Sequence, residues 1–173
     1  MIENAEKLND QAVKLAQSGS VNEAILCFKR AITLNSKNYL FWFNLGLTFR
    51  NSGNLREAKH AIEQSYTLAS YDADVIEALA AVCFELGDFE EALDCCYEGI
   101  YTFPENSHLW NTIGVVHFNQ EEYQEAADNF EHALSLNPYY YDALFNLRDT
   151  YIELRNTKGA AEIEKRMQSL EKI

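Results

Sequence analysis

The stretch "EEYQEAADNFEHALSLN" at residues 121–137 repeats a phrase that occurs three times earlier in the chain. The earlier copies are "GSVNEAILCFKRAITLN" at 19–35, "GNLREAKHAIEQSYTLA" at 53–69 and "GDFEEALDCCYEGIYTF" at 87–103. In this register, alanines recur every 34 residues: Ala24, Ala58, Ala92, Ala126 and Ala160. A fixed period of roughly 20–50 residues is typical of arrays of small structural units. The period therefore decides the fold.

A second helical pattern precedes each copy. Repeat positions 4, 7, 8 and 11 are apolar or small, and this i, i+3, i+4, i+7 spacing marks one face of a helix. In two repeats these residues are Trp42, Leu45, Gly46 and Phe49, and Trp110, Ile113, Gly114 and His117. Counted from Ala5, we expect a single domain over 1–173 with repeats at 5–38, 39–72, 73–106 and 107–140 and a degenerate capping repeat at 141–173.

These residues resemble the tetratricopeptide repeat family, whose pattern is W-x2-L-G-x2-Y, then A-x3-F, then P. The resemblance is carried by "WFNLGLTF" at 42–49 and "WNTIGVVH" at 110–117, followed by Ala126, Phe130 and Pro138 in the fourth repeat. It implies an all-α fold, a right-handed α-solenoid of antiparallel helix pairs. The fifth repeat departs from the pattern, with Arg148 in the small-residue slot and Glu164 in the aromatic slot.

The expected breaks fit this organisation. Gly19, Gly53 and Gly87 occur where the first helix of a pair must end, a place that favours glycine. Pro104 and Pro138 fall between repeats, where no helical N–H is lost.

Charge and composition limit the partners. Asp and Glu outnumber Lys and Arg by 27 to 14, a formal charge of -13, which disfavours nucleic acid and anionic membranes. This acidic balance is compatible with a basic or partly apolar protein partner. The start, "MIENAEKLNDQAVK", does not resemble a secretory signal, and no apolar run approaches the length of a membrane span. The four cysteines lack C-x-x-C spacing. We therefore expect a cytoplasmic protein with reduced thiols.

The sequence offers no pattern of catalysis. It contains no phosphate-binding loop, H-E-x-x-H or G-x-S-x-G motif, and its four histidines lack metal-ligand spacing. His117 occupies a core slot, where we expect a packed, partly buried ring. We predict no enzymatic activity, no catalytic residue, no metal site and no cofactor.

A second stripe, at repeat positions 2, 5, 9 and 12, lies on another side of the first helix, and in the tetratricopeptide family it lines the concave groove. The resemblance implies partner-binding residues on this stripe and beside it: Leu40, Phe43, Asn44, Leu47, Glu77, Ala81, Phe84, Asn111, Val115, Phe118, Phe145, Asn146 and Asp149. An acidic rim is expected from Asp74, Glu77, Glu85, Asp149 and Glu153. The alternative is that successive repeats curl tightly enough to bury these side chains.

Two subfamily patterns bear on the ligand. Co-chaperones that clamp the carboxylate of heat-shock chaperones use Lys, Asn, Asn, Lys and Arg, but this chain offers Asn9, Val13, Leu47, Glu77 and Ala81, so no such clamp is expected. Asn44 and Asn146 resemble rungs of the asparagine ladder of O-GlcNAc transferase, although a solvated asparagine is an equal reading.

We therefore expect a protein–protein interaction scaffold or adaptor that binds a peptide or amphipathic helix with apolar anchors and basic residues. The alternatives are a dedicated chaperone for a secreted bacterial substrate, a self-associating assembly subunit, and a subunit or regulator of an enzyme. The partner and the oligomeric state are left open.

Overall fold

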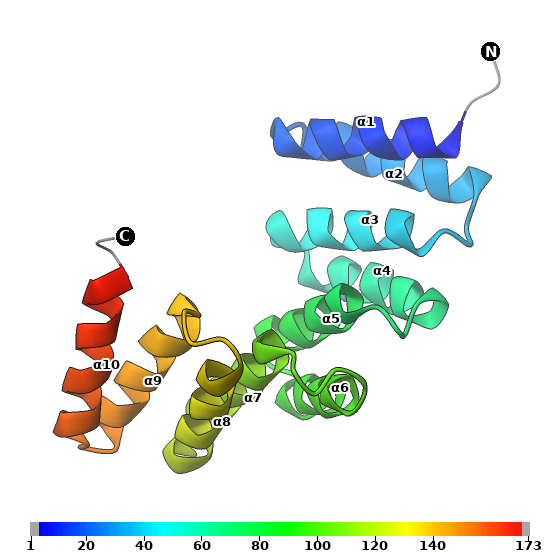
Figure 1. Cartoon of the computed structure of the whole chain (residues 1–173). Coiled ribbons are helices and arrows are strands. Elements are labelled where there is room, and N and C mark those ends of the chain that lie inside the picture. The colour runs from blue at the N-terminus through cyan, green and yellow to red at the C-terminus, as the bar shows by residue number, and fades with distance from the viewer. Residues whose placement is uncertain (1–3, 171–173) are drawn as a thin grey trace. The chain divides into compact units, whose positions relative to one another are not determined.

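The computed structural model describes residues 4–170, which form ten α-helices and contain no β-strand (Figure 1). The contacts divide the chain into two compact units, Met1–Asp88 and Phe89–Ile173, which are described in turn. The all-α fold predicted from the period is confirmed. The repeat bounds and the single domain stay predictions.

The first unit contains α1 (Ala5–Gln17), α2 (Val21–Leu34), α3 (Tyr39–Asn51), α4 (Leu55–Leu68) and α5 (Ala73–Leu86). Each helix packs against the next, and α3 also contacts α1 and α5. The core around α1, α2 and α3 combines small and large apolar side chains: Ala5, Ala12, Ala24, Phe28, Ala31, Ile32, Phe41, Leu45 and Ala61.

The second unit contains α6 (Phe89–Thr102), α7 (Ser107–Asn119), α8 (Tyr123–Leu136), α9 (Tyr141–Glu153) and α10 (Thr157–Leu170). Consecutive helices again pack together, and α7 also contacts α9. The core around α8, α9 and α10 consists of Ala126, Ala127, Phe130, Ala133, Leu134, Ala143, Leu144, Leu147, Ile163 and Met167.

Polar side chains begin four of the first helices at a spacing of 34 residues. The side chain of Asn4 accepts a hydrogen bond from the backbone N–H of Lys7 at 2.9 Å. The side chains of Asn38, Asp72 and Asn106 accept hydrogen bonds from the backbone N–H two residues later, at 3.1, 3.0 and 2.9 Å. Such N-caps satisfy N–H groups that have no partner within the helix. Tyr140, at the next equivalent position, makes no side-chain cap.

The turn inside each helix pair uses one left-handed residue. Gly19, Gly53 and Gly87 have φ of 84°, 79° and 83°, and the next two equivalent positions hold Glu121 and Arg155 with φ of 62° and 57°. The predicted helix ends at the three glycines are confirmed. A left-handed backbone costs a residue with a Cβ about 1–2 kcal/mol.

We expect Gly53→Ala to lower the free energy of unfolding by about 1 kcal/mol and Glu121→Gly to raise it by about 0.5–1 kcal/mol. A Cβ at Gly53 would meet no atom within 4 Å, so its cost is conformational and not steric. Urea denaturation followed by circular dichroism measures both variants. A stabilising Gly53→Ala would contradict this account.

The predicted core face is buried only in part. Leu45, Gly46, Ile113 and Gly114 are buried as expected, whereas the aromatic side chains of Trp42 and Phe49 are half-buried. Each tryptophan donates its indole N–H to a backbone carbonyl six residues earlier, Trp42 to Ser36 and Trp110 to Pro104, both at 3.0 Å. No helix in residues 4–170 is both long enough and apolar enough to cross a membrane.

Candidate partner-binding surfaces

The first unit carries a hollow beside two predicted groove residues, Asn44 and Leu47. We call it the α1–α3 hollow; its volume is about 380 Å³. Its lining comes from α1, α2 and α3: Val13, Ala16, Gln17, Val21, Phe28, Asn44, Leu47, Thr48 and Asn51. Aliphatic side chains and one phenylalanine thus form a largely apolar wall with amide groups at its edge.

The second unit repeats this construction. The α7–α9 hollow has a volume of about 130 Å³ and is lined by Val115, Phe118, Asn119, Phe130, Asn146 and Asp149. Each of these residues follows a residue of the α1–α3 hollow by 102 positions, three times 34; Val115 follows Val13, for example. Repeats 1 and 2 and repeats 4 and 5 therefore build the same hollow, and four of the predicted groove residues line the second one.

Paired asparagines border both hollows. Asn44 Nδ2 donates to Asn9 Oδ1 at 3.0 Å, and Asn146 Nδ2 donates to Asn111 Oδ1 at 3.1 Å. A buried threonine donates to the backbone carbonyl oxygen of one asparagine of each pair. Thr48 donates to Asn44 and Thr150 to Asn146, both at 2.7 Å. These asparagines are thus held by the protein and are not simply solvated.

Two of the five acids expected along the rim are neutralised by arginines. Arg50 donates to Glu85 Oε1 from Nε and Nη2 at 2.9 and 2.6 Å. Arg148 donates to Asp149 Oδ1 from Nε and Nη2 and to Glu164 Oε2 from Nη1. The hydrogen bond to Asp149, with the one to Glu164, raises the pKa of the Arg148 guanidinium.

The other predicted groove residues lie outside the two hollows. Leu40 and Phe145 are each 44% exposed, and the Arg148 guanidinium lies 4.3 Å from the centre of the Phe145 ring. Asn111 is buried, as the acceptor of Asn146. Phe43, Glu77, Ala81 and Phe84 are half-buried on α3 and α5.

Titratable groups form no metal centre in the described part of the chain: residues 4–170 contain no group of three His, Cys, Asp or Glu side chains that could hold a metal ion. His117 is packed and partly buried, as predicted, with Nδ1 at 2.6 Å from Glu122 Oε2. The four cysteines are free thiols.

Comparisons with known proteins identify the type of repeat. The tetratricopeptide repeat model matches residues 108–140, and the model of anaphase-promoting complex, cyclosome, subunit 3 matches residues 17–99. The solved structure of MamA from Desulfovibrio magneticus RS-1 superposes with a TM-score of 0.85 at 17% identity, covering 99% of this chain and 97% of that one. The chain therefore contains a tetratricopeptide repeat at residues 108–140, and its fold is that of a solved helical repeat protein.

Other relatives of this tetratricopeptide chain have varied names. It is 32% identical over 103 residues, 60% of its length, to the peroxisomal targeting signal receptor of Candida albicans. The structure of YrrB, described as a TPR protein with an unusual peptide-binding site, matches with a TM-score of 0.72 at 20% identity over 95% of this chain and 84% of that one. The chain spans only 17–27% of the length of the first curated relatives that it matches.

Several lining residues of the two hollows were not predicted as partner-binding. Phe28 and Phe130 fill the aromatic slot of the tetratricopeptide pattern and are buried, yet each also lines a hollow. Val13 occupies the same repeat position as Leu47 and Val115, so the repeat register itself carried the signal that could have identified it.

Proposed function

We propose that the chain is a protein–protein interaction scaffold, not an enzyme, and that the α1–α3 and α7–α9 hollows receive apolar side chains of an extended segment or amphipathic helix of its partner. The observation that carries the proposal is the repetition of one hollow in both units, with the same six repeat positions in its lining. A surface that is apolar, recessed and edged by a few polar groups suits ligand binding.

The paired asparagines support an extended ligand. Asn44 and Asn146 each use one side-chain N–H on the neighbouring asparagine, and a primary amide has a second N–H and a carbonyl oxygen. In the proposal these groups bond to the peptide backbone of the partner, while the bond to the neighbouring asparagine holds each amide in position. Backbone contacts of this kind tolerate many side chains on the ligand.

The partner is proposed to carry Lys or Arg next to its apolar anchors, because the chain has a formal charge of -13. Since Arg50 and Arg148 neutralise Glu85 and Asp149, the basic residues would meet other carboxylates, such as those of Asp74 and Glu153. The names of the peroxisomal targeting signal receptor and of YrrB, a receptor and a peptide binder, support such a role. The cytoplasmic location stays a prediction.

We expect the double variant Val13→Lys/Val115→Lys to bind the natural partner at least about tenfold more weakly, or about 1.4 kcal/mol. Both valines are half-buried at the same repeat position, so each lysine would occupy its hollow and repel a basic ligand. Proteins captured from the source cells by wild type and variant are compared by quantitative mass spectrometry, and the affinity of the captured partner is then measured.

The control is Lys7→Gln/Lys14→Gln, which changes two exposed residues of α1 away from both hollows. Circular dichroism verifies that each variant keeps its helices. Equal capture by the folded Val13→Lys/Val115→Lys variant would exclude the hollows as the binding surface.

A further inference from the structure

A larger hollow lies on another side of α3. The α2–α4 hollow has a volume of about 630 Å³ and lies within the first unit. Its lining is Lys29, Ile32, Thr33, Trp42, Leu45, Phe49, Arg56, Glu57, His60 and Ala61. At about 100° per residue, its α3 residues lie roughly 140° around that helix from those of the α1–α3 hollow. It is therefore a separate surface.

The floor of the α2–α4 hollow is apolar and aromatic. Trp42 and Phe49 are half-buried there, and Leu45 and Ile32 are buried beneath them. A volume of about 630 Å³ falls within the range of about 300–1,000 Å³ that is usual for ligand pockets. The floor can therefore accommodate a bulky apolar side chain.

The rim of this hollow is basic in a strongly acidic protein. Lys29, Arg56 and His60 surround it, against a single acid, Glu57. In the part of the chain that the structure describes, the side chains of Lys29, Arg56 and His60 make no ion pair; the Lys29 ammonium lies 5.9 Å from the centre of the Phe49 ring. The Lys29 and Arg56 cations thus remain available to an anionic group, and the imidazole N–H of His60 can donate a hydrogen bond to it.

The second unit contains the same hollow with the opposite charge. The α8–α10 hollow, of about 350 Å³, has eight lining residues that each follow a residue of the α2–α4 hollow by 102 positions. Lys29 is replaced there by Glu131, His60 by Glu162 and Phe49 by Tyr151. The Tyr151 hydroxyl donates to Glu131 Oε1 at 2.6 Å.

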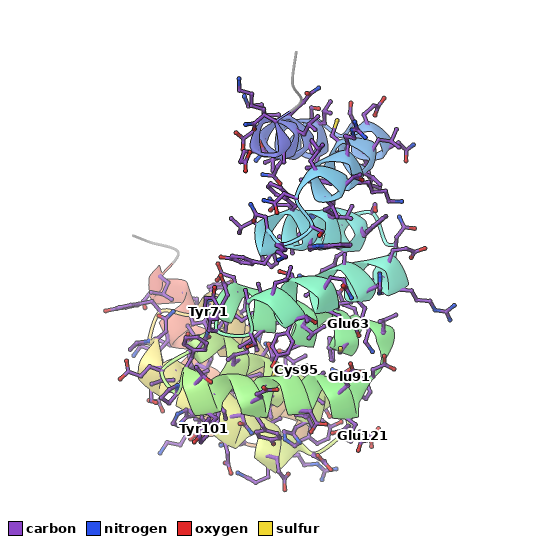
Figure 2. All side chains as sticks on the ribbon, turned by 90° about the vertical axis from the view of Figure 1, so that its right-hand side faces the viewer. Glu63, Tyr71, Glu91, Cys95, Tyr101 and Glu121 are labelled. Atoms are coloured by element: carbon purple, nitrogen blue, oxygen red, sulfur yellow. The ribbon has the colours of Figure 1, made fainter. Side chains whose placement is uncertain are left out.

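The hollow is thus present in both units. Lys29 and Arg56 border its apolar floor in the first unit, whereas Glu131, Glu162 and Arg166 border it in the second. The repeat position of Lys29 is occupied by Glu63, on α4 in Figure 2, in the second repeat and by Tyr97 in the third. The basic rim is therefore a property of these particular residues and not of the repeat pattern.

We propose that the α2–α4 hollow binds an acidic peptide segment of a partner protein, with one bulky apolar side chain on Trp42, Leu45 and Phe49 and flanking carboxylates at Lys29, Arg56 and His60. Charge complementarity selects this occupant: a carboxylate-rich segment is repelled by most of a chain with a formal charge of -13 and attracted at this rim. This ligand has the opposite charge to the one proposed for the α1–α3 hollow, so the two proposals stand or fall separately.

The test uses a displayed library of random twelve-residue peptides, selected on the full chain and counter-selected on its Lys29→Gln/Arg56→Gln variant. We expect enriched peptides in which Asp or Glu flanks Trp, Phe or Leu. The best of these, synthesised with capped ends, should bind the variant at least about tenfold more weakly than wild type, as expected for the loss of two charge pairs near a partly desolvated site. Its affinity should also fall as the salt concentration rises.

The matched control is Lys7→Gln/Lys165→Gln, which removes the same charge from two exposed positions outside the hollow, Lys165 being at the repeat position of Lys29. It should bind the peptide within about twofold of wild type. The fluorescence of Trp42 in a Trp110→Phe background locates the bound peptide. Three outcomes would overturn the proposal. The enriched peptides could be neutral or basic, or the control could lose as much peptide affinity as the Lys29→Gln/Arg56→Gln variant. The third outcome is that no peptide binds and light scattering shows a dimer that the Lys29→Gln/Arg56→Gln change abolishes.

Discussion

We expect Phe130→Ala to lower the free energy of unfolding by about 3–5 kcal/mol, the usual cost of removing a buried phenylalanine ring from a core. Phe130 is 0% exposed in the core of the second unit, and its ring lies against Gly114. Because a repeat is stabilised mainly by its neighbours, the loss should reach both α7 and α9. Urea denaturation followed by circular dichroism and by Trp110 fluorescence measures it.

The control for Phe130→Ala is Tyr101→Ala, also in the second unit and labelled on α6 in Figure 2. Tyr101 is 91% exposed, so its removal should change the free energy of unfolding by no more than about 0.5 kcal/mol. A loss below about 1.5 kcal/mol for Phe130→Ala would mean that neighbouring side chains collapse into the space that the ring leaves. That result would contradict the close packing inferred for α7 and α8.

The fold could be predicted because the period fixes which faces meet. Ala24, Ala58, Ala92 and Ala126 are each 0% exposed, as close contact between the helices of a pair requires. The same period also places Glu121 and Arg155 at the left-handed position of Gly19, Gly53 and Gly87. The residue types alone do not indicate a left-handed backbone at these two positions, since neither glutamate nor arginine is typical of that conformation.

Three polar contacts of the candidate surface could not be predicted from the repeat register because they follow a spacing of 35 and not 34. Asn9 with Asn44, Arg50 with Glu85 and Asn111 with Asn146 each join residues 35 apart on successive first helices. Comparison of equivalent repeat positions aligns residues 34 apart, so it does not bring together the two members of such a pair. The contact that neutralises or holds each of them lies one residue further along.

The hollows themselves could not be predicted from α3 alone. Its sequence is apolar on almost every side, which indicates that more than one side is covered. Whether a side is filled or recessed depends on the side chains that α2 and α4 supply. Trp42 and Phe49 match the core pattern of the family but lie half-buried in the α2–α4 hollow.

We expect Gly114→Ala to lower the free energy of unfolding by about 1–2 kcal/mol, although alanine is the better helix former. A Cβ at Gly114 would lie 2.6 and 2.7 Å from two Phe130 ring atoms, Cε1 and Cδ1, and 3.0 Å from a third, Cζ. Overpacking a core costs about 1–3 kcal/mol, and contacts this short place Gly114→Ala in the upper part of that range, at about 2–3 kcal/mol. Helix propensity returns about 1 kcal/mol. The ring is fully buried, so it can withdraw only toward the small α7–α9 hollow that it lines.

The sign of the Gly114→Ala effect should reverse when Phe130 is already alanine. In the Phe130→Ala background no ring opposes the new methyl group, so helix propensity alone should raise the free energy of unfolding by up to about 1 kcal/mol. The two backgrounds would then differ by about 2–3 kcal/mol, a coupling that residues in direct contact can reach. Additive effects of the two substitutions, measured by urea denaturation of all four proteins, would show that the cost at Gly114 arises elsewhere. The reversal would instead establish that the aromatic ring of the paired helix requires glycine at this position. Ile62 would place the same requirement on Gly46, where a Cβ would lie 2.5 Å from Ile62 Cγ1.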